Sequence, residues 1–263
     1  MKFSFIGAGN MASAIIDGIC LKNLAAPGDI CVSDKDRSKL DEFSKKGFVT
    51  SSSNEECAVF GDVIIIAVKP GIVPKIAPEI KSSVKDKLVI SIAAGVSSET
   101  LKNLLESNRV IRIMPNTPAL VGEGMTAVCK TDSTRDSDIN LVCDIFASVG
   151  KTIVITESQI DAVTAVSGSG PAYIYMVIEA MADGGVLCGL SRADAYALAA
   201  QTVLGSAKTV LETGIHPGAL KDMVCSPGGT TIEAVKVLES NCVRSAFIDA
   251  VTACCDKSKK MSN

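Results

Sequence analysis

The stretch Lys2-Phe3-Ser4-Phe5-Ile6-Gly7-Ala8-Gly9-Asn10-Met11-Ala12 begins with an apolar run and continues into small residues at a fixed spacing. Gly7, Gly9 and Ala12 match the pattern Gly-x-Gly-x-x-Gly/Ala, which joins the first strand of a dinucleotide-binding fold to its first helix. The first glycine permits the tight turn, the second lets a pyrophosphate approach, and the small third residue allows close helix–strand packing. The stretch therefore predicts a strand, a dinucleotide-binding turn and a helix; a merely tight turn is the alternative interpretation.

Short β-rich runs alternate with helical stretches through the first half of the chain. Helical segments such as residues 10–23 and 37–46 lie between most of the expected strands. These strands cover residues 2–7, 29–33, 63–68, 88–93, 110–114, 125–129 and 152–155. Because near-continuously apolar strands that alternate with helices are typical of a parallel sheet covered on both faces, we expect an α/β, doubly wound Rossmann-type domain over residues 1–156.

The pattern changes near Thr156, and no convincing strand follows. Thr156-Glu157-Ser158-Gln159 and Ser191-Arg192-Ala193-Asp194 fit capping boxes that begin helices. Alanine-rich helical patterns then cover residues 195–213, 230–239 and 243–257. We expect residues 157–263 to form an all-α domain that completes its core by pairing with a second copy of the chain.

The composition predicts a soluble protein of two ordinary domains. The chain has 263 residues, of which 47% are hydrophobic, and its formal net charge is −3. Acidic and basic residues are interspersed, so no block of like charge indicates a nucleic acid or an anionic membrane as partner. The apolar runs are far too short to span a membrane, and the first residues lack the pattern of a signal peptide. We therefore expect a cytoplasmic location.

The cysteines are interpreted as reduced thiols. There are 10 cysteines and 1 histidine, with no Cys-x-x-Cys pair. A zinc site requires clustered Cys and His ligands, so no metal is expected. Cys31 and Cys129 lie in apolar runs, where cysteine behaves as a small hydrophobic residue. Cys254 and Cys255 are expected on a fraying C-terminal helix, followed by a loose polar tail over residues 256–263.

A second candidate binding segment is Asp222-Met223-Val224-Cys225-Ser226-Pro227-Gly228-Gly229-Thr230-Thr231, which leads into the helical pattern of residues 232–239. The first N–H groups of a helix have no internal partner, and the helix dipole there favours negative charge. Two glycines let a ligand approach the backbone, so the segment predicts a site for a small anion such as a carboxylate. An ordinary Ser- or Thr-capped helix after a turn is the alternative.

The identity of the dinucleotide is left open by the charges after the second strand. Asp34 stands where an acidic residue usually holds the ribose hydroxyls of NAD. Ser33, Lys35 and Arg37 surround it and are suited instead to the 2′-phosphate of NADP.

Several motifs, in order and spacing, converge on one family over essentially the whole chain. Those of the first half, besides the glycine-rich turn, are Ala67-Val68-Lys69-Pro70, Ser91-Ile92-Ala93-Ala94-Gly95-Val96 and Arg112-Ile113-Met114-Pro115-Asn116-Thr117-Pro118. Those of the second half are Ser167-Gly168-Ser169-Gly170-Pro171-Ala172-Tyr173, Ala182-Asp183-Gly184-Gly185-Val186, and Leu220-Lys221-Asp222-Met223-Val224 with Ser226-Pro227-Gly228-Gly229-Thr230-Thr231. On these motifs the chain resembles the Δ1-pyrroline-5-carboxylate reductase family.

The resemblance implies reduction of the cyclic imine 1-pyrroline-5-carboxylate to L-proline, the last step of proline synthesis, with NADPH or NADH. The family usually prefers NADP(H), and many relatives carry a neutral residue where this chain has Asp34, so the resemblance leaves the preference of this chain open. The resemblance also implies homodimers with interleaved helical domains, which can assemble into rings such as a decamer.

Matching positions imply roles for individual residues. Asn10 and Met11 would line the pyrophosphate loop, and Asn54 would reach the adenosine ribose. The nicotinamide side would be lined by Ala67, Lys69, Pro70 and Asn116. With Gly7, Gly9, Ser33 and Lys35 from the local patterns, and Val68, Ala94 and Gly95 from the family motifs, these complete the expected cofactor residues. The substrate carboxylate would be held by Ser226, Gly229, Thr230 and Thr231.

Reducing a protonated imine requires little acid–base machinery from the protein, because the cofactor supplies the hydride and the protein positions the substrate. Residues 152–191 contain no Lys, Arg or His. Hydroxyacid dehydrogenases of related build, the main alternative, place a lysine on the long interdomain helix as the general base that alcohol oxidation requires. A non-catalytic nucleotide-binding protein is the other alternative.

Thr231 is the candidate proton donor to the ring nitrogen, through its hydroxyl or a bound water. The alternative is that it only positions the carboxylate. For Lys69 the alternative is a solvent-exposed residue at a strand end, and for Asn116 a turn residue. His216, before Pro217, is interpreted as a turn or helix-start residue rather than a catalyst.

Overall fold

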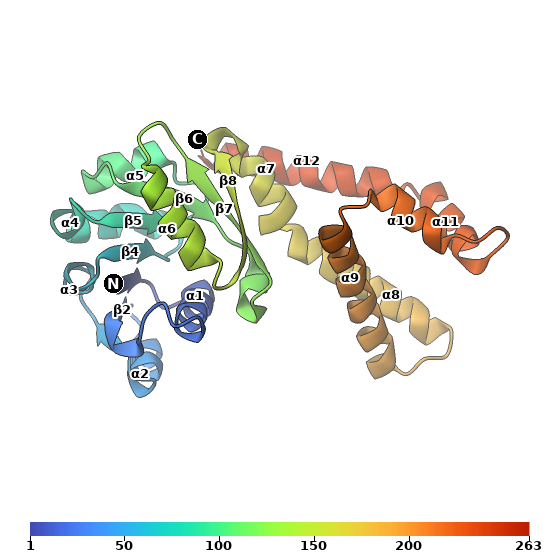
Figure 1. Ribbon diagram of the computed structural model, residues 1–263, viewed down its shortest axis with the longest axis horizontal. Coiled ribbons are helices and arrows are strands. Elements are labelled where there is room, and N and C mark those ends of the chain that lie inside the picture. The colour runs from blue at the N-terminus through green and yellow to red at the C-terminus, as the bar shows by residue number, and fades with distance from the viewer. Residues whose placement is uncertain (263) are drawn as a thin grey trace. The chain divides into compact units, whose positions relative to one another are not determined.

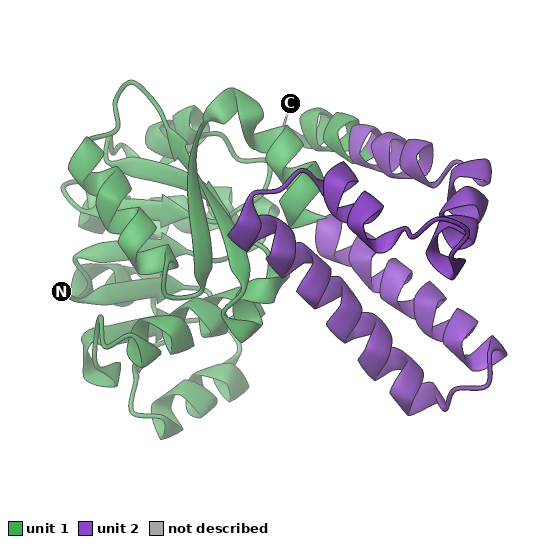
Figure 2. Ribbon diagram, turned by 45° about the vertical axis from the view of Figure 1, so that its right-hand side comes forward, with its two compact units in different colours: residues 1–169, 254–263 green, residues 170–253 purple. Residues whose placement is uncertain are grey.

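The computed structural model describes residues 1–262, and its chain divides into two compact units. Unit 1 comprises Met1–Ser169 together with the end of the chain from Cys254, and unit 2 comprises Gly170–Ala253. Figure 2 distinguishes the two units by colour.

Unit 1 is built on an eight-stranded sheet in the order β3-β2-β1-β4-β5-β6-β7-β8 (Figure 1). The strands are β1 (Phe3–Ile6), β2 (Ile30–Ser33), β3 (Val49–Ser51), β4 (Val63–Ile66), β5 (Leu88–Ser91), β6 (Val110–Met114), β7 (Gly124–Lys130) and β8 (Gly150–Thr156). β1 to β6 are parallel where they pair, which confirms the doubly wound α/β fold.

Helices bury both faces of this sheet. One core contains Ile65 of β4 with apolar residues of α1 (Asn10–Leu21), α2 (Arg37–Lys45) and α6 (Asp136–Phe146). The other contains Ile64 and Ile66 with residues of α3 (Asn54–Phe60), α4 (Val73–Val84) and α5 (Ser98–Leu105). Because successive side chains of a strand point to opposite faces, the Val-Ile-Ile-Ile run of β4 serves both cores.

Two features of the sheet differ from the expectation. β3 was not expected; Val49–Ser51 is a short edge strand whose residues are exposed or half-buried, so it has no apolar run to mark it. β7 is antiparallel to β6, so the expectation of a parallel sheet is wrong at this point. Parallel strands require a crossover of a dozen or more residues, whereas β6 and β7 are joined only by η3 (Thr117–Val121) and a turn at Gly122 with φ +76°.

The chain after β8 coils back toward the sheet edge. The capping box is confirmed, since both the Thr156 and the Gln159 side chains bond across the start of η4 (Glu157–Gln159). α7 (Ile160–Val163) follows and continues as a π-helical turn, η5 (Thr164–Gly168). Met114, Ala127, Cys129, Ile155 and Ile160 form a small core between this segment and β6–β8.

The chain is helical through Ser262, so the expectation of a fraying helix and a loose end is wrong for the described residues. α12 (Val243–Ser262) continues through the polar residues. Its last part belongs to unit 1, where the Ser258 hydroxyl donates to Asp161 Oδ1 at 2.6 Å and Cys254 Sγ lies 3.2 Å from Ser169 Oγ. These contacts with distant residues fix the end of α12 in place, although the polar composition of this segment alone predicts a solvent-exposed tail. Asn263, the last residue of the expected loose tail, lies outside the described residues.

Unit 2 consists of α8 (Gly170–Leu187), α9 (Arg192–Thr213), α10 (Pro217–Val224), α11 (Thr230–Ser240) and the first part of α12. Between Glu157 and Ser262 the structure contains helices and no strand, as expected. At the second expected capping box, the Ser191 hydroxyl accepts the Asp194 N–H at 3.2 Å and so caps α9. The Asp194 carboxylate accepts from the Ser191 hydroxyl at 2.6 Å, so the return bond to the Ser191 backbone N–H is not formed. His216 is the N-cap of α10, with Nδ1 accepting the Gly218 N–H at 3.1 Å, which confirms its interpretation as a helix-start residue.

The core of unit 2 is made of small residues. Ala182, Ala195 and Ala199 are its buried side chains, with Ile178 and Val186 packed against them. A Cβ added to Gly185 would lie 3.1 Å from Leu190 Cδ1 and 3.3 Å from Ala195 Cβ, so α8 and α9 pack closely because side chains are small at this contact. Many larger apolar side chains of unit 2 are left exposed, among them Tyr175, Met176, Leu187, Leu211, Met223 and Ile248.

Candidate cofactor and substrate sites

The glycine-rich turn has the geometry that its sequence predicts. Gly7 has φ +110°, a value favourable only for glycine, and a Cβ there would lie 2.5 Å from the Ala67 carbonyl oxygen. Its N–H donates to the Ser33 carbonyl at 2.7 Å. A Cβ at Gly9 would meet nothing within 4 Å, so the backbone there faces open space. Gly9 is the N-cap of α1 and supplies no side-chain cap, which leaves the first N–H groups of the helix for an anion.

A cavity of about 380 Å³ opens beside this turn, over the carboxyl ends of β1, β2 and β4. This is the place where β1 is flanked by β2 on one side and β4 on the other, the switch point at which doubly wound sheets bind nucleotides. Eight of the expected cofactor residues line it: Gly7, Gly9, Ser33, Lys35, Asn54, Ala67, Val68 and Lys69. Asp34, Lys39, Ile72, Lys75 and Ile76 complete the lining.

Asn54, the first residue of α3, is fixed at this cavity by hydrogen bonds through both ends of its amide. Its Oδ1 accepts from the Ser33 hydroxyl at 2.8 Å, and its Nδ2 donates to Glu79 Oε2 at 2.7 Å. Ser33 and Asn54 therefore act as one hydrogen-bonded unit at the end of β2. Lys39, Lys75, Ile72 and Ile76 were not expected here, because they reach the cavity from helical segments rather than from the loops that follow strands.

The remaining expected cofactor residues lie beside the cavity lining. Asn10 and Met11 are the first two residues of α1, and Met11 packs against the core. Pro70 begins η2 (Pro70–Ile72) directly after Lys69. Ala94 and Gly95 lie in the loop after β5, where Gly95 has φ +74°. These loops follow the carboxyl ends of adjacent strands β4 and β5.

Asn116 follows β6, and its amide is engaged by the protein itself. Its Oδ1 accepts the Met125 N–H at 2.8 Å, and its Nδ2 donates to the Ser167 carbonyl at 3.1 Å. Asn116 thus joins the end of β6 to the start of β7 and to the π-helical turn. It is more than a turn residue, since it holds three segments of unit 1 in register.

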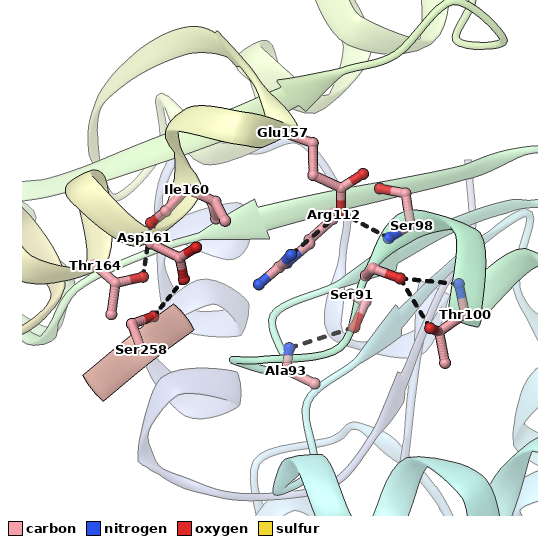
Figure 3. Close-up of polar contacts among 11 residues, drawn as sticks. Ser91, Ala93, Ser98, Thr100, Arg112, Glu157, Ile160, Asp161, Thr164 and Ser258 are labelled. Carbon is pink, nitrogen blue, oxygen red and sulfur yellow. Dashed lines mark hydrogen bonds and ion pairs between the residues drawn. The ribbon is translucent and has the colours of Figure 1, made fainter. Parts of the chain in front are cut away.

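Sequence reasoning missed an ion pair between a buried arginine of β6 and a half-buried glutamate of η4 (Figure 3). Arg112 lies on β6 with 3% of its surface exposed, and its Nη1 donates to Glu157 Oε1 at 3.1 Å. The same oxygen accepts the N–H of Ser98, the first residue of α5, at 2.7 Å. The available signal was an arginine inside the apolar run Val110-Ile111-Arg112-Ile113-Met114, which predicts a buried partner.

Cys129 lies near this pair and is a core thiol, as expected. Burial raises its pKa to about 12, with Arg112 lowering and Glu157 raising it by smaller amounts. A thiol with so high a pKa is protonated and unreactive at neutral pH.

The expected carboxylate-binding loop is in unit 2, between α10 and α11. Gly228 has φ +67°, and the Gly229 N–H closes the turn onto the Ser226 carbonyl at 3.0 Å. Gly229 is the N-cap of α11, with no side-chain cap, so the alternative of a Ser- or Thr-capped helix is wrong. Thr230 and Thr231 are the first helical residues, and their N–H groups lie at the positive end of the helix dipole.

In residues 1–262 no group of three His, Cys, Asp or Glu side chains is arranged to hold a metal ion. Over the same residues, no helix has the length and apolar character that crossing a membrane requires.

Comparison with known proteins identifies the family. The pyrroline-5-carboxylate reductase of Escherichia coli strain K12 is 52% identical over 99% of this chain and 98% of that protein. The chain belongs to the pyrroline-5-carboxylate reductase family. The pyrroline-5-carboxylate reductase of Arabidopsis thaliana is 43% identical over 99% of this chain and 95% of its own length. The family model for pyrroline-5-carboxylate reductase dimerisation matches residues 157–261, and the model described as NADP oxidoreductase, coenzyme F420-dependent, matches residues 2–95.

Solved structures of pyrroline-5-carboxylate reductases have the same fold. The Coxiella burnetii structure gives a TM-score of 0.92 at 38% identity, covering 100% of this chain and 98% of that one. The Plasmodium falciparum pyrroline carboxylate reductase with NADP bound gives 0.89 at 37% identity, with the same coverage. A Mycobacterium tuberculosis 3-hydroxyisobutyrate dehydrogenase shares the fold alone, with a TM-score of 0.52 at 16% identity over 72% of this chain and 66% of that one.

Proposed function

We propose that this protein reduces 1-pyrroline-5-carboxylate to L-proline with NAD(P)H. The observation that carries the proposal is the 52% identity to a pyrroline-5-carboxylate reductase over 99% of the chain. The cavity at the switch point of the sheet, with its glycine turn open above Gly9, fits the nucleotide that the reaction requires. NAD(P)H supplies a hydride when bound, so the protein's task is to hold it and the imine in register.

The cofactor is proposed to lie along the carboxyl ends of the strands of unit 1. Gly7, Gly9, Asn10 and Met11 would hold the pyrophosphate at the start of α1, where N–H groups point outward. Ser33, Lys35 and Asn54 would contact the adenosine ribose and its 2′-position. The nicotinamide end would be lined by Ala67, Val68, Lys69, Pro70, Ala94, Gly95 and Asn116.

The substrate carboxylate is proposed to bind the loop before α11. Ser226, Gly229, Thr230 and Thr231 offer two backbone N–H groups at a helix N-terminus together with three hydroxyls. Thr231, half-buried, is proposed as the proton donor to the ring nitrogen, through its hydroxyl or a bound water. This step moves one proton and leaves the hydride to the cofactor.

Assembly into a homodimer is supported by the apolar groove of unit 2. The groove has a volume of about 590 Å³. It is lined by Tyr173, Met176, Val177, Ala180, Met181, Leu238, Val243, Ala246, Phe247 and Ala250. A core of three alanines is too small to bury these side chains, so a second copy of the same helices is the proposed cover. Rings of dimers, such as a decamer, are a further proposal.

We also propose a functional division into a nucleotide-binding part, residues 1–156, and a helical dimerisation and substrate part, residues 157–263. A cytoplasmic location is proposed as well. The protein contains ten free thiols, which favour a reducing compartment. Cell fractionation checks the location.

The function is tested by the oxidation of reduced nicotinamide on addition of pyrroline-5-carboxylate, with proline identified as the product. Oxidation of 3-hydroxyacids with NAD(P)⁺, in place of imine reduction, would instead support a hydroxyacid dehydrogenase. Tight cofactor binding with no turnover of any cyclic imine would leave a nucleotide-binding protein without this activity.

A further inference from the structure

The carboxylate of Asp34 is locked in place at the rim of the cofactor cavity. The N–H of Ala8, inside the glycine-rich turn, donates to Asp34 Oδ2 at 2.8 Å. The N–H of Asp36 donates to Asp34 Oδ1 at 2.9 Å. The side chain is 20% exposed, so both oxygens are fixed relative to the turn that would hold the pyrophosphate.

A lysine stands opposite this carboxylate. Lys39 Nζ, on α2, lies 4.0 Å from Asp34 Oδ2, and its side chain is 45% exposed. Lys35 and Lys75 also line the cavity. One carboxylate held by two hydrogen bonds and three more exposed lysines thus line the cavity at the end of the second strand.

The two kinds of charge favour different dinucleotides. A carboxylate that accepts one hydrogen bond at each oxygen keeps lone pairs for further donors, and a ribose 2′-hydroxyl is such a donor. A 2′-phosphate has no proton to donate and carries like charge, so it is repelled by Asp34 and attracted by Lys39. Asp34 is held in position by two backbone N–H donors. Lys39 loses side-chain entropy when it is ordered against a phosphate, and solvent and salt screen its charge.

We propose that Asp34 and Lys39 form an opposed pair that sets the cofactor preference, with Asp34 directing the protein toward NADH. The proposal rests on the proposed function for the identity of the reaction. It goes beyond that function by assigning the choice between NADH and NADPH to one contact. Neutralising Asp34 has two effects in the same direction, since it removes the repulsion and frees Lys39 for the phosphate.

The test compares Asp34→Asn with Asp36→Asn. Asp36 is the exposed N-cap of α2, accepts from Ser38, and does not line the cavity, so its variant makes the same change of charge two residues away. The ratio of kcat/KM for NADPH to that for NADH is measured at saturating imine. We expect the ratio to rise at least about tenfold in Asp34→Asn, because a contact repulsion at a partly screened site is removed. In Asp36→Asn it stays within about twofold of the parent.

Lys39→Met is the complementary variant. It is expected to lower kcat/KM for NADPH and to leave the value for NADH nearly unchanged. In Asp34→Asn/Lys39→Met, the gain for NADPH seen in Asp34→Asn should be smaller, since the freed lysine is gone. Raising the salt concentration should narrow the differences among the variants.

A ratio unchanged in Asp34→Asn, or raised equally in Asp36→Asn, would overturn the proposal. Asn has one side-chain acceptor oxygen, so it can accept from only one of the two backbone N–H groups that Asp34 binds. A loosened turn would weaken the binding of both cofactors equally, and that loss cancels in the ratio. Asp34→Ser, which also removes the charge, is a second variant in which the same ratio is measured. Dissociation constants for NADPH and NADH, measured without imine, test the role of Asp34 and Lys39 independently of the proposed imine reductase activity. A shifted ratio of these constants with no imine reduction supports the opposed pair and refutes the proposed function.

Discussion

Glu157 Oε1 lies 3.1 Å from Arg112 Nη1, so the first residue of η4 is ion-paired with a buried arginine on β6. The same carboxylate oxygen holds the N-terminus of α5 through Ser98. Glu157 therefore connects the start of α5, which follows the loop with Ala94 and Gly95, to β6 and to the end of β8. Arg112 Nε and Ser98 Oγ are buried without a hydrogen-bond partner, which makes the Glu157 contact the main compensation for a buried charge.

Removing this carboxylate should destabilise the protein. We expect Glu157→Ala to lower the free energy of unfolding by roughly 3 kcal/mol, because Arg112 would remain buried without an opposite charge. Urea denaturation followed by circular dichroism measures the change. Glu157→Gln keeps an acceptor oxygen and should lose less. The matched control is Glu99→Ala on the exposed side of α5, with an expected change below about 0.5 kcal/mol. A loss in Glu157→Ala no greater than in this control would contradict the role.

Acid should weaken a second ion pair. Arg109 donates to Asp138 through Nε at 2.9 Å and Nη2 at 2.7 Å, and this hydrogen bonding holds the pKa of Asp138 below its ordinary value. A carboxyl with a lowered folded-state pKa contributes stability above its unfolded pKa of about 3.9, and loses that contribution as the pH falls through the folded value. The stability gap between parent and Asp138→Asn should therefore be constant above about pH 5 and close below about pH 4. Unfolding free energies of parent and variant, measured across that pH range, test the prediction, with the exposed Asp144→Asn as the control variant. A stability difference between parent and Asp138→Asn that stays the same below about pH 4 would contradict it.

Gly9→Ala should separate cofactor binding from folding. A Cβ at Gly9 meets nothing within 4 Å, and its φ of −84° suits alanine, so stability should be unchanged within about 0.5 kcal/mol. The added methyl group enters the space through which the pyrophosphate would approach, so cofactor affinity should fall at least about tenfold. Calorimetric titration with NADPH and NADH measures this. If Gly9→Ala binds the cofactor with the affinity of the parent protein, the pyrophosphate does not bind at this turn. In Gly7→Ala, by contrast, the collision with Ala67 should also impair folding.

Thr231→Ala should impair the handling of the imine. Hydrogen bonds to a charged ligand contribute about 1.5–3 kcal/mol, so kcat/KM for the imine should fall about 10- to 150-fold while the cofactor dissociation constant is retained. Ser240→Ala, at the other end of α11, is the control. An unchanged kcat/KM in Thr231→Ala would dismiss its role at the carboxylate and at the ring nitrogen.

A charge in the groove of unit 2 should disrupt assembly. Met176 lines the groove and is 70% exposed in the single chain, so Met176→Glu would place a carboxylate in the proposed dimer interface. Light scattering should show the parent as a dimer or larger and the variant shifted toward monomer. Val59→Glu, at a 62% exposed position on α3, should leave the mass unchanged. A monomeric parent would refute the dimer directly.

The parts of the fold that the sequence predicts are those governed by local rules. The turn at Gly7 and Gly9 follows from conformational freedom and close approach, and the caps at Thr156 and Ser191 follow from unpaired N–H groups at helix starts. The strand β7 was expected but its antiparallel direction was not, and the edge strand β3 was not expected at all. Strand direction and edge pairing depend on the connections and on neighbouring strands, which a hydrophobic pattern does not record. The family resemblance added Asn54 and Ala67, which line one cavity together with Ser33.

The residues that sequence reasoning did not place are those whose position depends on tertiary packing. Lys39 and Lys75 are ordinary surface lysines by pattern, and they become cavity residues only because α2 and α4 lie beside it. The pairing of Arg112 with Glu157 spans 45 positions along the chain. No local pattern specifies a partner at that separation.

The bond between Ser258 and Asp161 joins positions 97 residues apart, and its later partner lies within the last few residues of the described chain. The ribosome makes the N-terminal end first, so the nucleotide-binding half lacks this hydrogen bond until Ser258 has been translated. Unit 2 is translated inside that interval. A stop codon between Asp161 and Ser258 would therefore remove a contact from the half of the protein that is made first.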